Sequence, residues 1–290
     1  MPRGSCTFGI VRSIEATKGR TRLAELCEIL SRELGTLFIP HHAETYGALT
    51  DACSRGEVGL AWLPPLACVR IEDAVAGTVL ALPVRRGAVS YRAALIGSSI
   101  RPDAPQTLKD IAGRRVAWVD RESSSGYHVP RLFLEGAGLP AAGCFSDERF
   151  VGSHSNVVAA VVSGAVDVGA TYCALAASPN DSGPQTLPPP AAPPPLPQGP
   201  WSSTSGAAPP LRILATTGAI PNDALVVSNR LAADVRLALV RWILAISGSR
   251  AQALSGELFG ADAFRVASPT HFEPLRRLVA MARMRAARPS

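Results

Sequence analysis

Residues 118–130 read Trp-Val-Asp-Arg-Glu-Ser-Ser-Ser-Gly-Tyr-His-Val-Pro, and this stretch decides the fold. The largely apolar residues at 114–120 predict a strand, and the segment after Gly126 predicts a helix that extends to about residue 138. Three serines and a glycine therefore lie between the end of a strand and the first turn of a helix. A strand that leads through a polar loop into a helix is a building unit of α/β proteins.

The loop formed by Ser123, Ser124, Ser125 and Gly126 has the composition of an anion-binding site. The first N–H groups of a helix have no partner within the helix, and the helix dipole places partial positive charge there. Serine hydroxyls can turn their protons toward an anion, and glycine permits close approach of the backbone. One serine would suffice as an ordinary helix cap, whereas three in a row favour an uncharged cradle for a tetrahedral oxyanion.

A second polar loop contains His154, in the sequence Gly-Ser-His-Ser-Asn at 152–156, just ahead of a helix expected at 156–163. A single histidine is more often a structural residue whose hydrogen bonds are satisfied within the protein. Beside a phosphate group, its ring could instead donate a hydrogen bond from either nitrogen. Both interpretations of His154 stay open from the residues alone.

Short apolar strands and helices alternate on both sides of these loops. Further strands are expected at 8–11, 36–39, 58–62, 79–83, 91–96, 166–170, 211–215 and 224–227. Further helices are expected at 23–34, 46–53, 107–113 and 231–246. Such close alternation indicates parallel sheets covered by helices.

The composition is that of a folded protein, because 47% of the 290 residues are hydrophobic and 18% are charged. The net charge of +6 does not indicate a nucleic-acid partner. Five arginines without any acid lie between residues 276 and 290, and they account for all but one of these charges. A basic helical end of this kind is more often a solvated surface.

The motifs of common enzymes and metal sites are missing, so no catalytic residue, metal or cofactor is predicted. The six cysteines are scattered, with no Cys-x-x-Cys pair, and this pattern fits a reducing compartment better than a disulfide framework. The first residues contain no apolar segment typical of a secretory signal, and no apolar run approaches the ~20 residues of a membrane span. The sequence therefore predicts a cytoplasmic protein without membrane insertion, or a periplasmic one if the true start lies upstream.

The composition changes sharply at 179–210, where 12 of the 25 prolines lie beside one charged residue, Asp181. Few residues there can donate backbone hydrogen bonds or pack in a core. We expect a disordered or polyproline-II insert in the second half of the chain.

Several segments in the same order resemble the phosphate, phosphite and phosphonate-binding proteins of ABC transporters, which have the type-II periplasmic-binding-protein fold. The resemblance covers most of the chain outside the proline-rich insert. Its segments are Tyr-Gly-Ala-Leu-Thr-Asp-Ala at 46–52, Gly-Glu-Val-Gly-Leu-Ala-Trp-Leu-Pro-Pro at 56–65, Ser-Tyr-Arg-Ala-Ala-Leu-Ile at 90–96, Leu-Lys-Asp-Ile-Ala-Gly-Arg-Arg-Val-Ala-Trp-Val-Asp at 108–120, the serine loop at 123–130, the stretch from His154 to 170, Leu-Arg-Ile-Leu at 211–214 and Ile-Pro-Asn-Asp at 220–223.

The resemblance implies an α/β fold of two lobes joined by two crossover strands, with mixed, mostly parallel sheets, helices on both faces and a hinge that closes on the ligand. Residues 1–88 would begin lobe 1, and residues 89–217 would form lobe 2 with the insert at 179–210. Residues 218–290 would return to lobe 1 and supply the C-terminal helices.

The resemblance also implies a set of ligand-binding residues. Ser123, Ser124 and Ser125 would hydrogen-bond the phosphorus oxyanion within a loop completed by Gly126 and Tyr127, and His154 would add a donor. Tyr46 and Tyr91 would close over the ligand, and Asp223 matches an aspartate near the cleft of the family.

The implied function is reversible capture of phosphate, phosphite or an alkylphosphonate, with an ABC permease or a signalling protein as partner. Relatives that bind aminoalkyl phosphonates carry an acidic residue where this chain has the apolar stretch 172–176, so such ligands are disfavoured. The absence of a signal favours one alternative, a cytoplasmic enzyme of the chorismate dehydratase type on the same fold. A third hypothesis is a protein–protein adaptor that uses the insert and the arginine-rich end, and deleting 179–210 would distinguish it.

Overall fold

The chain folds into two units. Unit 1 contains Met1–Val89 and Pro221–Phe272, and unit 2 contains Ser90–Ile220 and Glu273–Ser290. The structure is a computed structural model that describes residues 4–11, 21–140, 143–174, 199–200, 210–268 and 270–286. The chain passes from one unit to the other three times, at 89–90, 220–221 and 272–273.

A six-stranded sheet in the order β12-β4-β11-β3-β1-β2 forms the centre of unit 1. The strand β1 pairs in parallel with both of its neighbours, whereas β11 pairs antiparallel with β3 and β4. The strands are β1 (Ser5–Val11), β2 (Leu37–Ala43), β3 (Leu60–Leu63), β4 (Gly77–Val84), β11 (Ala224–Ser228) and β12 (Ala263–Val266). The strand β11 therefore returns from the second half of the chain into the middle of a sheet built by the first half.

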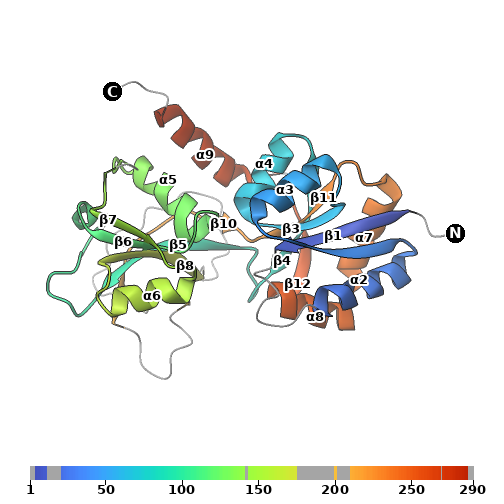
Figure 1. Ribbon diagram of the computed structural model, residues 1–290, viewed down its shortest axis with the longest axis horizontal. Helices are drawn as coiled ribbons and strands as arrows, with labels where there is room; N and C mark the ends of the chain where they lie inside the picture. The colour runs from blue at the N-terminus through green and yellow to red at the C-terminus, as the bar shows by residue number, and fades with distance from the viewer. Residues whose placement is uncertain are drawn as a thin grey trace. The chain divides into compact units, whose positions relative to one another are not determined.

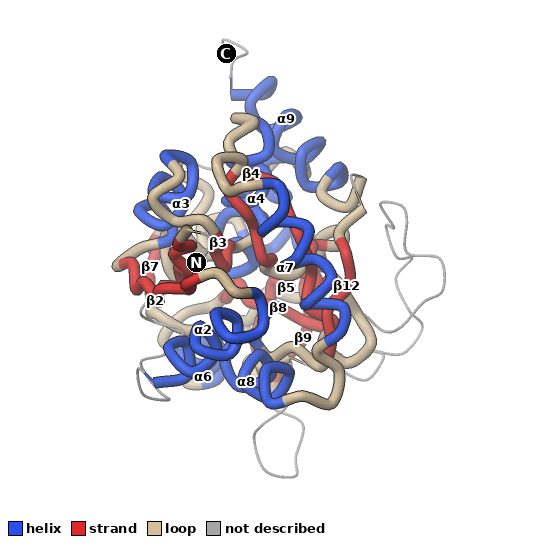
Figure 2. The backbone as a smooth tube through the Cα atoms, turned by 90° about the vertical axis from the view of Figure 1, so that its right-hand side faces the viewer, coloured by secondary structure: helices blue, strands red, loops and turns tan. Residues whose placement is uncertain are grey.

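Helices cover both faces of this sheet (Figure 1). One face carries α2 (Thr21–Leu34), α7 (Ala233–Ala245) and α8 (Arg250–Phe259), and α2 lies beside α8 (Figure 2). The other face carries α3 (Tyr46–Arg55) and α4 (Pro65–Asp73). Capping residues determine where α3 begins and ends. The Thr45 hydroxyl accepts a hydrogen bond from the Ala48 N–H at its start, and Gly56 adopts the left-handed conformation at φ 78° after its last turn.

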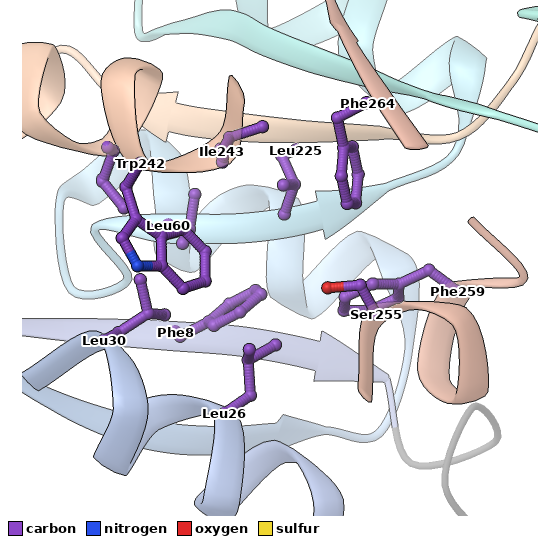
Figure 3. A pocket seen from close by; sticks show the side chains of 11 residues that line it. Phe8, Leu26, Leu30, Leu60, Leu225, Trp242, Ile243, Ser255, Phe259 and Phe264 are labelled. Atoms are coloured by element: carbon purple, nitrogen blue, oxygen red, sulfur yellow. The ribbon is translucent and has the colours of Figure 1, made fainter. Parts of the chain in front are cut away.

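The core of unit 1 is packed almost completely. Trp62 stacks on Phe259 with a centroid distance of 4.2 Å, between β3 and α8. A cavity of about 10 Å³ remains beside them, lined by apolar side chains that point toward one another and by Ser255 (Figure 3). Its volume is that of about one water molecule, so it is a packing defect and not a ligand site.

The six-stranded sheet of unit 2 follows the order β10-β5-β8-β6-β7, with β9 also paired to β5. The strands β6, β7 and β8 are mutually parallel, and β5 is antiparallel to β8 and β9. The strands are β5 (Ser90–Ser98), β6 (Arg115–Trp118), β7 (Asp147–Phe150), β8 (Val168–Ala174), β9 (Leu211–Thr216) and β10 (Ile220–Pro221). The carboxyl ends of β6, β7 and β8 therefore meet at one edge of the sheet.

Two apolar layers hold the helices of unit 2. The helices α6 (His154–Val162) and α5 (Val129–Gly136) lie on opposite faces of the sheet (Figure 1). Val157 and Val161 of α6 pack on one face, and Leu134 of α5 packs on the other. The helix expected at 107–113 is a short 3₁₀ helix, Leu108–Ile111, with the capping box between Thr107 and Asp110. The last helix, α9 (Glu273–Ala286), contacts α5.

The α/β class, the mixed sheets and the type-II binding-protein fold agree with the sequence interpretation. Fewer strand pairs are parallel than expected, because the strands β4, β5 and β11 pair antiparallel with their neighbours. The expected return of 218–290 to lobe 1 differs for its last part, since α9 groups with unit 2 through its contact with α5. The chain consequently crosses between the units three times and not twice. Most of the proline-rich insert expected at 179–210 lies outside the described residues.

All six cysteines are described and buried as free thiols. Burial raises the pKa of Cys6 and of Cys53 to about 12, so both are protonated at neutral pH. They act as small apolar residues of the core.

Candidate anion-binding site

The serine loop begins at Ser123, with four residues between it and the end of β6 at Trp118, and continues as a π-helical turn, η2 (Ser124–His128). The His128 N–H donates to the Ser123 carbonyl at 3.0 Å, which is the five-residue spacing of this turn. The Ser123 hydroxyl accepts a hydrogen bond from the Gly126 N–H at 3.0 Å. Ser123 therefore caps the turn, and helix α5 continues directly from it with proline in its first turn.

Close packing explains the glycine of this loop. A Cβ atom on Gly126 would lie 2.3 Å from Cγ2 and 2.5 Å from Cβ of Val119, at the end of β6. The same two residues are joined by the backbone, since the Val119 N–H donates to the Gly126 carbonyl at 3.1 Å. The loop can lie this near the strand only without a side chain at position 126.

The two inner serines of the loop are buried, with Ser124 5% and Ser125 4% exposed. The Ser124 hydroxyl oxygen has no hydrogen-bond partner among the described residues. A buried hydroxyl without a partner costs about 1–3 kcal/mol, so such a group calls for a partner from outside the protein, such as water or a ligand. Ser124 is therefore the serine of this loop that we consider first as a ligand contact.

The loops after β6 and β7 are tied together at the carboxyl edge of the sheet. The Val119 carbonyl accepts a hydrogen bond from the Gly152 N–H at 2.8 Å, and the Trp118 carbonyl accepts one from the Val151 N–H at 3.0 Å. Because the Val119 N–H binds Gly126, one residue connects both loops. The turn η2 also contacts β8 and β5. Ligands of α/β proteins bind outside this edge of the sheet.

His154 lies at the first position of α6, after the helix cap Ser153. Its Nδ1 lies 3.0 Å from the hydroxyl of Thr171 on β8. Burial lowers the pKa of His154 to about 4, although the charge of Asp120 acts in the opposite direction. The ring is therefore neutral at pH 7 and can donate one hydrogen bond without carrying charge.

An aromatic wall stands beside this histidine. The Tyr172 ring packs edge-on against His154, with centroids 4.9 Å apart, and against Tyr91, with centroids 6.4 Å apart. Tyr172 is 37% exposed, whereas its neighbour Thr171 is completely buried. The predicted residues Tyr91 and His154 thus meet through Tyr172, which the sequence interpretation placed in an apolar stretch without a role.

Tyr127 lies in a separate aromatic cluster. Its ring packs edge-on against Trp118 at 5.5 Å and against Phe150 at 5.1 Å, and the Arg131 guanidinium lies 5.5 Å from its centroid. These contacts fasten η2 to β6 and β7. Support of the loop accounts for Tyr127, and its contact with a ligand stays a prediction.

The remaining two predicted residues, Tyr46 and Asp223, belong to unit 1. Tyr46 is the first residue of α3, and its carbonyl accepts the hydroxyl proton of Thr50 at 2.6 Å. A carboxylate oxygen of Asp223 lies 3.4 Å from a guanidinium nitrogen of Arg85, which also donates to the Phe259 carbonyl at 2.8 Å. Their roles toward a ligand remain predictions.

Residues 8–272 match the model of the family described as the phosphonate ABC transporter, periplasmic substrate-binding protein. The chain belongs to this family. Solved structures show the same fold. A Xanthomonas citri protein bound to ATP has a TM-score of 0.73 and 20% identity, over 97% of this chain and 98% of that one.

Two further structures are named for phosphonate transport. The binding-protein component of an ABC phosphonate transporter from Pseudomonas aeruginosa has a TM-score of 0.68 and 18% identity, with 98% of this chain and 88% of that chain covered. PhnD1 from Prochlorococcus marinus, in complex with methylphosphonate, has the same TM-score and identity, with 98% and 99% covered.

Membership of this phosphonate-binding family implies a ligand and a permease as partners, as the sequence interpretation held. The family is one of substrate-binding components of transporters. Its description places it in the periplasm, the second of the two locations that the sequence left open. Within the described part of the chain, no helix is both long and apolar enough to cross a membrane.

The structure adds two residues that the sequence interpretation missed, Thr171 and Tyr172. Their position along the sequence could have indicated them. Both lie toward the carboxyl end of β8, which is parallel to β6, the strand that leads into the serine loop. The alternation of faces along β8 then buries Thr171 and exposes Tyr172.

Proposed function

We propose that this member of the phosphonate-binding family reversibly captures a small phosphorus oxyanion on the loop from Ser123 to Gly126. The candidates are phosphate, phosphite and an alkylphosphonate. The buried, unpartnered hydroxyl of Ser124 carries the proposal, because it is a donor fixed at the start of a helix, where an anion is stabilised.

Neutral donors would hold the anion. Hydroxyl groups of Ser124 and Ser125, N–H groups of the first turn and the uncharged ring of His154 together offer hydrogen bonds without a formal positive charge. In such a site, fixed dipoles rather than a formal positive charge would stabilise the oxyanion.

The organic part of the ligand is the second element of the proposal. Strand β8 presents Tyr172 beside His154 and contains no acidic residue. A ligand amine would find no carboxylate on this strand, which favours a ligand with hydrogen, hydroxyl or a small alkyl group on phosphorus.

Uptake through an ABC permease is the role we propose for the complex. Closure of the two lobes on the ligand, and a location in the periplasm, are predictions that rest on the family. The family match supports capture without covalent chemistry over the dehydratase alternative.

Thermal melting of the full chain tests the proposal. We expect one of phosphate, phosphite and methylphosphonate to raise the midpoint, because a ligand at 100 times its dissociation constant adds about 2.7 kcal/mol. 2-Aminoethylphosphonate should act more weakly, and chorismate should have no effect.

Two variants make this measurement specific. The double substitution Ser124→Ala/Ser125→Ala should remove the ligand-induced rise, whereas Ser255→Ala, a buried serine of α8 in unit 1, should keep it. A rise that survives the double substitution would move the ligand away from the serine loop. Stabilisation by chorismate alone would support the enzyme alternative and reject the proposal.

A further inference from the structure

The side chain of Thr171 on β8 contacts the ring of His154, which lies outside the sheet. Its side chain is completely buried on β8, and its hydroxyl lies 3.0 Å from Nδ1 of His154 at the start of α6. Among the described residues, the His154 ring is the one hydrogen-bond partner of this hydroxyl. The other ring nitrogen, Nε2, forms no hydrogen bond with any described residue. It is also not one of the fully buried polar atoms that lack a partner.

Which atom donates in this hydrogen bond follows from the number of protons that the two groups carry. A threonine hydroxyl carries one proton, and when the group is buried that proton needs an acceptor. Nδ1 of His154 is the acceptor within reach. If Nδ1 carried the ring proton instead, the Thr171 hydroxyl could only accept, and its own proton would be buried without a partner. The cheaper arrangement has the hydroxyl donating to a bare Nδ1.

We propose that Thr171 is a positioning residue that fixes His154 as the tautomer with its proton on Nε2, so that the ring presents an N–H to the bound oxyanion. The inference rests on the proposed function and deepens it. It assigns the ring one role, that of donor, although a neutral histidine could equally be an acceptor that would repel an anion.

The surroundings of His154 support a fixed neutral donor. Tyr172 packs edge-on against the ring at 4.9 Å and restricts its rotation. Asp120, at the end of β6, is the charged group whose field reaches the ring, and α6 presents only neutral side chains in its first turn. Protonation of Nδ1 would deprive the buried Thr171 proton of its acceptor. The hydrogen bond therefore disfavours a second proton on the ring.

Nitrogen NMR of the ligand-free protein tests the tautomer directly. Two-bond proton–nitrogen correlations distinguish a histidine protonated on Nε2 from one protonated on Nδ1, and His154→Gln assigns the signals. We expect the Nε2–H pattern in the native chain and in Thr171→Ser, which keeps the hydroxyl. Thr171→Val, which keeps the shape, should give a mixture of tautomers.

Affinity for the phosphorus anion that stabilises the native chain should follow the same order. We expect Thr171→Val to weaken binding about tenfold, the effect of one misdirected hydrogen bond, and Thr171→Ser to stay within about threefold. Thr36→Val, a buried threonine of unit 1, is the matched control and should leave the affinity unchanged.

The NMR and affinity measurements distinguish a wrong assignment of Thr171 from a wrong proposed function. A native His154 protonated on Nδ1, or a Thr171→Val protein with an unchanged tautomer pattern, would overturn the assignment of Thr171. Failure of every phosphorus anion to bind the native chain would reject the proposed function, while the NMR result would still decide the tautomer.

Discussion

Replacing Gly126 with alanine is expected to abolish the melting response to phosphorus anions and to lower the free energy of unfolding by about 3 kcal/mol. The new Cβ would lie 2.3 Å from a methyl group and 2.5 Å from Cβ of Val119, so the loop must move off the strand. That movement breaks the hydrogen bond between the Val119 N–H and the Gly126 carbonyl and displaces the buried serines. Urea denaturation and ligand-dependent melting measure both effects.

Gly136→Ala is the matched control for this substitution. Position 136 lies at the end of α5, and a Cβ atom there would meet nothing within 4 Å. Alanine favours a helix over glycine by up to about 1 kcal/mol, so this variant should bind normally and unfold at an equal or higher temperature. Normal binding by Gly126→Ala would show that the loop tolerates a side chain and does not hold the ligand.

Replacing Asp167 with alanine is expected to destabilise the protein by about 3 kcal/mol without changing the residues of the serine loop. The Asp167 carboxylate is 7% exposed and accepts three hydrogen bonds from Arg115, two from its guanidinium and one from its backbone N–H. Arg101 adds a fourth at 3.3 Å. Removal of the acid takes away the partner shared by Arg115, at the start of β6, and Arg101, which follows β5.

The same group predicts a pH dependence. The hydrogen bonds from Arg115 hold the pKa of Asp167 at about 2, below its ordinary value of 3.8. A lowered pKa contributes stability above pH 4, and that contribution, about 2 kcal/mol, is lost as the pH falls from 4 to 2. The difference in unfolding free energy between the native chain and Asp167→Ala should therefore shrink over this interval.

Asp103→Ala provides the comparison, because Asp103 binds Arg101 at 2.6 Å but has 64% of its side chain exposed. An exposed ion pair contributes at most about 1 kcal/mol, so this variant should unfold nearly as the native chain does. Equal destabilisation by the two substitutions would show that the burial of Asp167 is unimportant.

The elements that could be predicted from the sequence are those with local signals. The helix expected at 23–34 is present as α2, the helix expected from residue 107 begins at Leu108 after the cap Thr107, and the serine loop lies between β6 and α5 as predicted. Each of these depends on residues within one or two turns of one another.

What could not be predicted depends on contacts between distant segments. The antiparallel position of β11 between β3 and β4, and the contact of α9 with α5, join residues more than 100 positions apart. The contacts of Tyr127 depend on how η2 packs against Trp118 and Phe150, and those of Thr171 and Tyr172 depend on their places on β8. The resemblance named all three serines of the loop, and the structure distinguishes among them by the buried Ser124 hydroxyl, which has no partner among the described residues.

The position of β11 in the sheet also affects when the strands of unit 1 can pair during synthesis. On the ribosome, β1 to β4 emerge first, but the strand that joins β3 to β4 lies at Ala224–Ser228, after all the described strands of unit 2. Until then, β3 has one unpaired edge and β4 has no partner strand, and an unpaired strand edge is a template for wrong pairing with another chain. The strands β5 to β9 of unit 2 are all present by residue 216, before β11 and β12 complete the sheet of unit 1, so the sheet made from the middle of the sequence can pair its strands first.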